Sequence, residues 1–403
     1  MNRESGVFES DRRGFLKAAA TATIGLAASS AKVTGAGQSA PRIRMGVDAF
    51  SLGAQNWTPF QTLDWASKLQ VNMVHFSEIR FLGSPKWQEA LTPDNLKRIR
   101  ERAAELKIDV EIGMRSICPT AADFQNAQKN DPTLGTADDQ IARMIVAAKT
   151  IGSPIVRCVQ GTQADRRTGL DGHIAETVKV VKRNRSRLMD AGVKLAIENH
   201  AGDMQGRELK RLIEEAGPDC IGACVDTGNA VWTIEDPADT LDALAPYALT
   251  SHFRDSYVFN SPQGIASQWT RMGDGNVGIA DIIKTYVAKC PGKAVSLEVI
   301  VQGNWRLFNY RDPTAWEIFQ SVPAPAFARF LALAEKGVAK ELPPPGTGRG
   351  GGGGNTGGGA GRGTQGPPAA GGGRGAPSPE AQARNLADVE ASVRWTQDVL
   401  ARL

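Results

Sequence analysis

Four short apolar runs in the chain each end in an acidic residue or a histidine. The runs read LAIE, ACVD, LTSH and VSLE, and they end at Glu198, Asp226, His252 and Glu298. Carboxylates at the end of apolar runs need a compensating cation when they are buried. Three carboxylates and one imidazole form a mainly oxygen ligand set, which suits Mn²⁺, Mg²⁺ or Co²⁺ better than Zn²⁺. The sequence therefore predicts one divalent metal ion at these four residues, with Mn²⁺ as the best match and Mg²⁺, Co²⁺ or Zn²⁺ as alternatives.

These four runs belong to a longer series of strand-like segments, most of them followed by a helical pattern. The eight candidate strands are Ile43–Phe50, Met73–Ser77, Asp109–Met114, Pro154–Val159, Lys194–Glu198, Ile221–Asp226, Leu249–Phe253 and Ala294–Ile300. The candidate helices between them are Thr62–Leu69, Pro93–Leu106, Ala137–Thr150, Ile174–Ala191, Gly206–Glu215 and Ala280–Ala288. Eight such repeats favour a single-domain α/β fold, a (β/α)₈ TIM barrel over residues 42–342, and no GxGxxG motif follows the first strand. In such a barrel the carboxyl ends of the strands share one face, where active sites lie.

The motifs around the strand ends carry a family resemblance. They are ENH at 198–200, DTGN at 226–229, HxxD at 252–255, MGDG at 272–275, and Glu298. With these motifs the body of the chain resembles the xylose isomerase-like TIM-barrel family, in particular its sugar phosphate isomerase/epimerase branch. The resemblance implies that Glu198, Asp226, His252 and Glu298 bind one divalent metal. It also implies that Glu198 and Glu298 are catalytic, acting as opposed acid and base across a sugar.

The residues that would meet a substrate are less sharply indicated. His200, Asn229 and Asp255 lie beside the ligand motifs, and Glu78 and Arg115 follow the second and third candidate strands. We interpret all five as candidate substrate-binding or supporting groups. Many relatives carry His where this chain has Asn229. Two positions at which some ketose epimerases place a substrate-binding Glu and Arg fall here on Met204 and Val258.

Three functions fit these residues. The first is a metal-dependent isomerase or epimerase of a free, non-phosphorylated sugar or keto-sugar, in which a glutamate moves a proton through a metal-stabilised enediolate. The second is a 3-keto-glycoside lyase or hydratase that uses the same metal site. The third is a non-catalytic sugar-binding barrel. A DNA-repair endonuclease of the same superfamily is set aside, because the chain holds only four His and a formal net charge of +4 over 403 residues.

The two ends of the chain differ from the body. Residues 10–17 read SDRRGFLK and precede a short apolar stretch, a pattern that resembles a twin-arginine signal peptide over residues 1–36. We therefore expect a periplasmic or otherwise exported protein that engages the twin-arginine export machinery. Residues 343–379 are rich in Gly and Pro, which predicts a flexible insertion. Residues 380–403 return to a helical pattern, which predicts a last helix that packs on the barrel and is interrupted in its apolar stripe by Thr396.

Composition limits the partners and the roles of the remaining residues. The small net charge argues against nucleic acid, and the apolar run near the N-terminus is too short for stable membrane insertion. A small-molecule sugar is the expected partner, and the sequence leaves a homo-oligomer open. Five Cys without a CxxC pair indicate neither a zinc ribbon nor a disulfide framework, and Cys118 and Cys158 are expected to be buried thiols. His75 and His173 are expected to be structural, and tryptophans such as Trp232 to be core residues.

Overall fold

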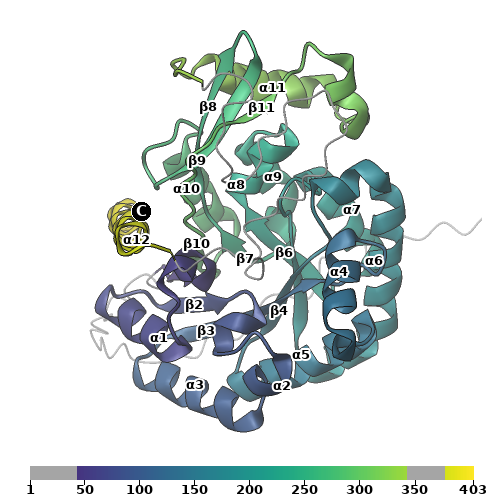
Figure 1. The fold of residues 1–403 in the computed structure, drawn as a ribbon, viewed down its shortest axis with the longest axis vertical. Coiled ribbons are helices and arrows are strands. Elements are labelled where there is room, and N and C mark those ends of the chain that lie inside the picture. Colours follow the sequence, from purple (N-terminus) through teal and green to yellow (C-terminus); the bar gives the residue numbers. More distant parts are fainter. Residues whose placement is uncertain (1–42, 343–376) are drawn as a thin grey trace, which may run out of the picture. The chain divides into compact units, whose positions relative to one another are not determined.

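A computed structural model describes residues 43–342 and 377–403, and its centre is a barrel of parallel strands (Figure 1). The strands are β1 (Met45–Asp48), β2 (Met73–Phe76), β3 (Asp109–Ser116), β4 (Ile155–Val159), β5 (Lys194–Glu198), β6 (Ile221–Asp226), β7 (Ala248–His252) and β10 (Val295–Leu297). They form one eight-stranded sheet in the order β10-β1-β2-β3-β4-β5-β6-β7. A parallel bridge between Phe253 and Leu297 joins the end of β7 to β10. The predicted single-domain TIM barrel is confirmed, and all eight candidate strands are barrel strands.

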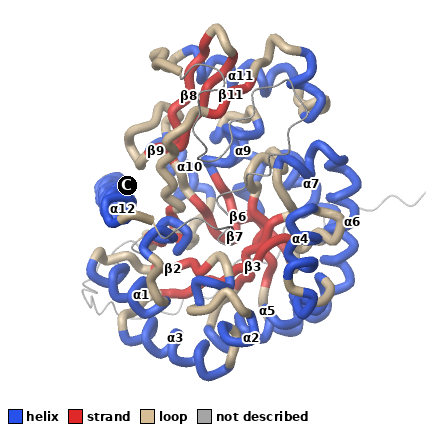
Figure 2. Tube along the Cα trace, in the orientation of Figure 1, coloured by secondary structure: helices blue, strands red, loops and turns tan. Residues whose placement is uncertain are grey.

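Helices surround the strands, which Figure 2 shows as red strands ringed by blue helices. They are α1 (Pro59–Lys68), α2 (Trp87–Ala90), α3 (Pro93–Glu105), α4 (Ala122–Asn130), α5 (Ala137–Ile151), α6 (Gln163–Ala191), α7 (Gly206–Ala216), α8 (Thr227–Ala230), α9 (Pro237–Leu244), α10 (Ile279–Lys289), α11 (Ala324–Glu335) and α12 (Pro379–Leu400). Local sequence explains several helix starts. Thr58, Thr92 and Thr136 cap α1, α3 and α5 with their side chains, and proline opens α1 and α3. None of the described helices is long and apolar enough to cross a membrane.

The helix α6 begins eleven residues before the predicted segment, at Gln163 instead of Ile174. Its first turn is capped by Thr162, and the chain leaves helical geometry at Gly169, where φ is 128°. A residue with a side chain rarely adopts this φ, so glycine allows the bend here. The sequence pattern indicated only the part of α6 that follows the bend.

A second, antiparallel sheet was not predicted. It consists of β8 (Asp255–Ser261), β9 (Gly264–Thr270) and β11 (Arg306–Phe308), in the order β11-β9-β8. The hairpin β8–β9 lies in the connection from β7 to α10, and β11 follows β10. Both segments are therefore insertions that follow barrel strands, at the face where active sites of this architecture lie. Figure 1 shows this sheet together with α11 at one end of the barrel.

The last helix, α12, begins one residue before the predicted boundary and contacts the first segments of the barrel. The side chain of Asn385 donates to the backbone oxygen of Ser51 at 3.0 Å, and Gln397 donates to that of Leu69 at 2.6 Å. Val389 and Val393 are fully buried, and so is Thr396, where the pattern had suggested an interruption. The predicted twin-arginine segment and residues 343–376 of the predicted insertion lie outside the described residues.

The inside of the barrel is polar near its carboxyl end. Side chains alternate along a strand, so Ile155 shares a face with Arg157, Ala196 with Glu198, and Cys224 with Asp226. Ile155, Ala196 and Cys224 form a small apolar cluster that is separate from the main hydrophobic core. The charged side chains two positions further along each of these three strands are buried as well. This layer of buried charge is where the candidate site lies.

Candidate metal centre

The four residues predicted as metal ligands meet at one point inside the barrel. Glu198, Asp226, His252 and Glu298 each offer one ligand atom, and these four atoms all lie within 4.8 Å of one another. His252 Nδ1 lies 3.0 Å from an Oε2 atom of each glutamate. Three of the side chains are completely buried, and Glu298 is only 4% exposed. Four consecutive strand ends therefore create a single compact donor set.

The donor set fits a divalent cation. His252 Nδ1 and Asp226 Oδ2 are buried and make no hydrogen bond with the described residues, although Nδ1 lies 3.0 Å from both glutamates and Oδ2 lies 2.8 Å from Arg254 Nη2. Two buried atoms of this kind, crowded by charged groups, fit a cation that would bind both of them. Three carboxylates with one imidazole match the ligand preference of Mn²⁺ or Mg²⁺, and one nitrogen also admits Zn²⁺.

Hydrogen bonds to Asn199 and Asn229 hold Asp226 in place. The side chain of Asn199 donates from Nδ2 to the Asp226 carbonyl at 2.7 Å and accepts from the Asp226 amide at 2.9 Å. Asp226 Oδ1 accepts from the amide of Asn229 at 2.7 Å and so caps the short helix α8. One carboxylate oxygen is thus used by the fold, and the other, Oδ2, faces the donor set and Arg254.

Two arginines that the sequence analysis did not single out compensate the glutamates. Arg157 on β4 donates from Nε to Glu198 Oε2 at 2.6 Å, and Arg254 pairs with Glu298 through Nη2. Burial would raise the pKa of Glu198, but Arg157 and His252 outweigh it and hold the pKa well below its usual range. Burial would also raise the pKa of Glu298, but Arg254 and His252 outweigh this effect and lower the pKa. Both glutamates are therefore anionic, as a metal ligand or a general base must be.

Asp226 behaves differently from the glutamates. Arg254 Nη2 lies 2.8 Å from its Oδ2. Burial nevertheless raises the pKa of Asp226 to about 8, because Arg254 only partly offsets the loss of water and Glu198 and Glu298 add like charge. A divalent ion at this point would favour the ionised form of Asp226.

Below the donor set, His252 contacts two further residues that sequence reasoning missed as site residues. Its Nε2 lies 3.2 Å from Asp48 Oδ2 and 2.9 Å from His75 Nδ1. Asp48 ends β1, and its other oxygen accepts from the Phe50 amide at 2.6 Å and from Ser77 Oγ at 2.8 Å. Asp48 also ends a candidate strand, so the signal that singled out the four ligands was present at this position too.

Two predicted substrate-binding residues lie beside the donor set. Asn229 Nδ2 donates to Glu198 Oε1 at 3.1 Å, while its own Oδ1 is buried without a partner. His200 Nδ1 bonds to the Gly161 carbonyl at 2.9 Å. Because this bond uses Nδ1 as the donor, the other ring nitrogen of His200 is an acceptor. Both residues are well placed for a substrate, and that role stays a prediction.

The other three predicted substrate-binding residues are engaged with the fold. Asp255 accepts from the amides of Gly273 and Gly275 at 2.9 Å each, and so fastens the MGDG turn. Glu78 and Arg115 pair with each other at 3.3 Å, and Arg115 also pairs with Asp123. None of the three contacts the four candidate ligands in the described ion pairs and hydrogen bonds. Their substrate contacts likewise stay predictions.

Of the five cysteines, Cys224 lies at the donor set, because its Sγ and ligand atoms of Glu198 and His252 lie within 4.8 Å of one another. All five are free and buried, as predicted for Cys118 and Cys158. Burial raises the pKa of Cys158 and of Cys224 to about 12, which leaves both as thiols. Cys118 Sγ lies 3.8 Å from His173 Nδ1, but the two ring nitrogens of His173 already bond to the hydroxyls of Thr120 and Thr168.

The comparison with protein families matches this architecture. The family model described as "Xylose isomerase-like TIM barrel" matches residues 63–316, which is more than half of the chain. The chain belongs to this family. The resemblance seen in the strand-end motifs is thereby confirmed at the level of the family.

The individual proteins that this chain resembles are more distant from it in sequence. A curated relative, 3-oxo-isoapionate decarboxylase of Pectobacterium atrosepticum, is 21% identical over 176 residues, covering 44% of this chain. The match spans about half, 54%, of that enzyme. D-psicose 3-epimerase of Clostridium cellulolyticum aligns with a TM-score of 0.49 and 10% identity over 72% of this chain and 96% of the epimerase. 3-Keto-D-glucoside 4-epimerase of E. coli aligns with a TM-score of 0.46 and 11% identity over 72% of this chain and 98% of the epimerase.

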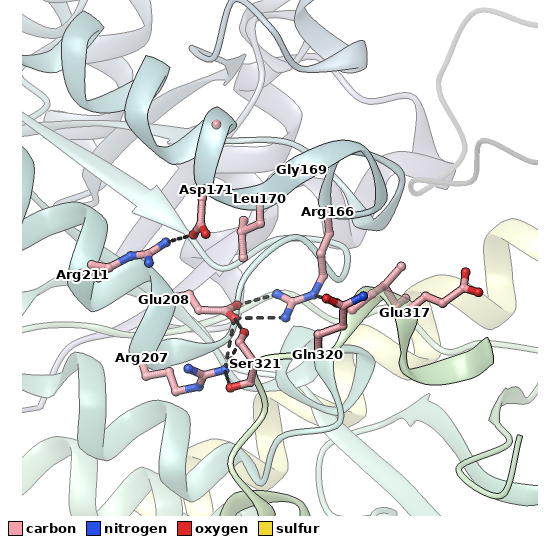
Figure 3. A pocket seen from close by; sticks show the side chains of 12 residues that line it. Arg166, Gly169, Leu170, Asp171, Arg207, Glu208, Arg211, Glu317, Gln320 and Ser321 are labelled. Atoms are coloured by element: carbon pink, nitrogen blue, oxygen red, sulfur yellow. Dashed lines mark hydrogen bonds and ion pairs between the residues drawn. The ribbon is translucent and has the colours of Figure 1, made fainter. Parts of the chain in front are cut away.

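The structure also contains a cavity that is separate from the candidate metal centre. A cavity of about 350 Å³ lies among the first part of α6, the start of α7 and residues 317–321 (Figure 3). Several of its charged side chains pair with each other, such as Arg166 with Glu208 at 3.0 Å and Arg211 with Asp171 at 2.5 Å. None of the four candidate ligands lines it. The metal centre, and not this cavity, is therefore the candidate functional site.

Proposed function

We propose that this protein is a divalent-metal-dependent isomerase or epimerase of a free, non-phosphorylated sugar or keto-sugar. The single observation that carries the proposal is the convergence of Glu198, Asp226, His252 and Glu298 on one buried point. A scaffold or binding barrel has no need for three buried carboxylates packed around one imidazole, because burying that much charge costs stability. Membership of the xylose isomerase-like family supports the same proposal.

The chemistry follows from the two glutamates. When bound, a divalent cation would draw electrons from a substrate carbonyl and make the neighbouring C–H more acidic. Glu198 and Glu298 are both anionic and both lie at the donor set, on strands separated by β6 and β7. One glutamate would remove the proton from carbon, and the other would take up a proton from solvent and pass it to the opposite face, which inverts the centre. Return of the proton to the neighbouring carbon would instead interconvert an aldose and a ketose.

Arg157 and Arg254 would support this transfer. Each holds one glutamate by a buried ion pair, which orients the carboxylate and keeps it charged. Arg254 Nη2 also lies 2.8 Å from Asp226 and 3.7 Å from Glu198. A guanidinium at this position would stabilise negative charge that develops on substrate oxygens.

A lyase or decarboxylase is the second candidate, and the curated relative is the observation that favours it. That enzyme is named for decarboxylation of a 3-oxo acid. Loss of CO₂ from such an acid, elimination from a 3-keto-glycoside and removal of a proton beside a carbonyl all leave an electron pair next to a carbonyl. The same donor set can stabilise each of them.

We also propose that the protein is exported by the twin-arginine route. The RRGFLK motif at residues 12–17 and the apolar stretch after it support this proposal. Fractionation of cells that produce the full chain tests it. The expected result is periplasmic protein for the natural sequence and cytoplasmic precursor for the double variant Arg12→Lys, Arg13→Lys. An unchanged distribution would contradict the proposal.

The test of the reaction is uptake of solvent deuterium by a panel of free ketoses, aldoses and 3-keto-glucosides, incubated with the Mn²⁺-loaded protein. Mass spectrometry and NMR locate the label and identify an epimer, an isomer, an eliminated aglycone or a decarboxylated product. Metal-dependent label beside a carbonyl is the expected result. Glu298→Gln should lose it, whereas the exposed control Glu176→Gln should retain it. No label in any substrate, with metal bound, would refute the isomerase proposal.

A further inference from the structure

Four flat side chains are stacked beside the metal centre. The Arg254 guanidinium carbon lies 4.2 Å from the centre of the Trp269 ring. Trp269 stacks on Trp232 with ring centres 4.1 Å apart and an interplanar angle of 3°. The guanidinium carbon of Arg306 lies 4.1 Å from the Trp232 ring on its other side. The order of the stack is therefore Arg254, Trp269, Trp232, Arg306.

The two indoles are spacers in this stack and not a platform for a sugar. Trp232 is 7% exposed and Trp269 is 2% exposed, so the core assignment predicted for Trp232 is confirmed. Each ring is covered on one face by the other ring and is contacted by a guanidinium. Trp269 Nε1 also donates to the Gly228 carbonyl at 2.7 Å, which holds the stack against the loop after β6. Guanidinium groups bind well to such ring faces.

The two ends of the stack differ in their charge partners. Arg254 pairs with Glu298 and Asp226 of the metal centre. Arg306 has no ion pair with any carboxylate in the part of the chain that the structure describes. Its described partners are the Trp232 ring and Gln163 Oε1. Burial alone lowers the pKa of Arg306 to about 10, without a nearby acid to oppose it.

The position of Arg306 places this cation at the mouth of the barrel. Arg306 begins β11, which follows the barrel strand β10, and it pairs with Ser267 of β9. Its partner Gln163 begins α6, which follows β4. Trp232 lies just after Asp226 and α8. All these segments follow barrel strands at their carboxyl ends, the same face that holds the four candidate metal ligands.

We propose that Arg306 binds a carboxylate of the substrate, so that the sugars on which this site acts are sugar acids. This inference rests on the proposed function and names its substrate class. A partly buried guanidinium without an acidic partner gains most from an anionic ligand. One face of the guanidinium lies on Trp232 and its Nη2 bonds to Gln163 Oε1, so the remaining N–H groups are left to donate to the oxygens of a carboxylate.

The test is binding of matched acid and neutral sugars to the full chain, measured by isothermal titration calorimetry with and without Mn²⁺. The pairs are D-glucuronate with D-glucose, D-galacturonate with D-galactose, and 5-keto-D-gluconate with D-fructose. At least one acid should bind the natural protein about 10- to 100-fold more tightly than its neutral partner, as expected for bonds to a charged group. Arg306→Gln should remove that preference, and Arg306→Lys should restore part of it.

Matched controls separate this site from its surroundings. Arg311→Gln, at an exposed arginine that bonds to Tyr310 and to the Ser261 carbonyl, should leave the preference unchanged. The melting temperature and the Mn²⁺ affinity of Arg306→Gln should match those of the natural protein. If Arg306→Gln fails to fold, Arg306→Lys alone decides, with a preference reduced at least threefold supporting the proposal.

Three results would overturn the inference. One is the absence of any acid preference in all three pairs. A second is a preference that disappears when Mn²⁺ is removed and is unchanged in Arg306→Gln, since the carboxylate would then bind the metal. A third is tighter binding of D-glucose 6-phosphate than of D-glucuronate. Failure of the proposed function would give a different result. The protein would then prefer acids in a way that depends on Arg306, but no bound acid would take up deuterium.

Discussion

The parallel barrel and the antiparallel sheet β8–β9–β11 contribute different things to the same site. The barrel strands β5, β6, β7 and β10 supply the carboxylates and the imidazole that surround one buried point. The inserted sheet supplies Trp269 and Arg306, which extend the site outward from that point. Barrel topology alone brings the strand ends together, whereas the insertions vary freely in such folds. Under the two proposals above, the barrel would hold the reacting part of the substrate and the inserted sheet would hold its carboxylate.

The largest effect should come from the barrel. Glu198→Gln and Glu298→Gln each keep the shape of the side chain but remove the base, so the rate of deuterium uptake should fall by about 10²- to 10⁴-fold. Circular dichroism and the melting temperature should stay close to those of the natural protein. Retention of the natural rate in either variant would show that its glutamate is not the acid or base.

The next largest effect should come from the sheet, and it should be on stability. Trp269→Leu removes a ring that is 2% exposed and stacked between Trp232 and Arg254, together with its bond to Gly228. The free energy of unfolding should fall by about 2–4 kcal/mol, measured by urea denaturation. The half-buried Trp57→Leu is a suitable control and should lose less. A loss no larger than in Trp57→Leu would mean that the stack does not hold the sheet against the barrel.

The same comparison explains what the sequence could predict. Buried parallel strands appear as continuous apolar runs, so all eight barrel strands and the ends at Glu198 and Glu298 could be located. The strands β8 and β9 mix polar and apolar residues, as in DSYVFNS and GIASQWT, and they lack a long apolar run. Arg306 lies in a three-residue strand whose pairing with β9 depends on tertiary contacts. Local patterns do not contain that pairing.

Contacts between side chains across the barrel could not be predicted from the sequence either. Arg157 on β4 and Arg254 after β7 are ordinary arginines until the fold places them on Glu198 and Glu298. His75 was expected to be structural, and it lies fully buried against His252. Sequence distance hides such contacts, because His75 and His252 are 177 residues apart. Burial and charge pairing are properties of the closed barrel and not of any one strand.

A smaller effect, on Mn²⁺ affinity, is expected from a change at Asp48 inside the barrel. In Asp48→Asn the retained Oδ1 can still accept from Phe50 and Ser77, but an amide NH₂ replaces the oxygen that faces His252 Nε2. The amide NH₂ removes the acceptor that favours a proton on Nε2, so the tautomer with its proton on Nδ1, the atom offered to the metal, gains population. Mn²⁺ affinity, measured by chelator competition, should fall about 10- to 100-fold. Ser77→Ala is the control and should change it less than about threefold; equal affinity in Asp48→Asn and the natural protein would remove Asp48 from the metal centre.

The smallest expected effect concerns a buried acid deeper in the barrel. Glu111 on β3 accepts from Thr250 Oγ1 at 2.6 Å, and burial raises its pKa to about 7 from an ordinary value of 4.5. Because the folded state holds the proton more tightly than the unfolded state, the contribution of Glu111 to stability is complete below about pH 4.5 and is lost as the pH rises through 7. Glu111→Gln cannot ionise and can still accept from Thr250. Its melting temperature should therefore exceed that of the natural protein by a few degrees at pH 8 and should match it near pH 5. A difference that is the same at both pH values would mean that Glu111 does not titrate between them.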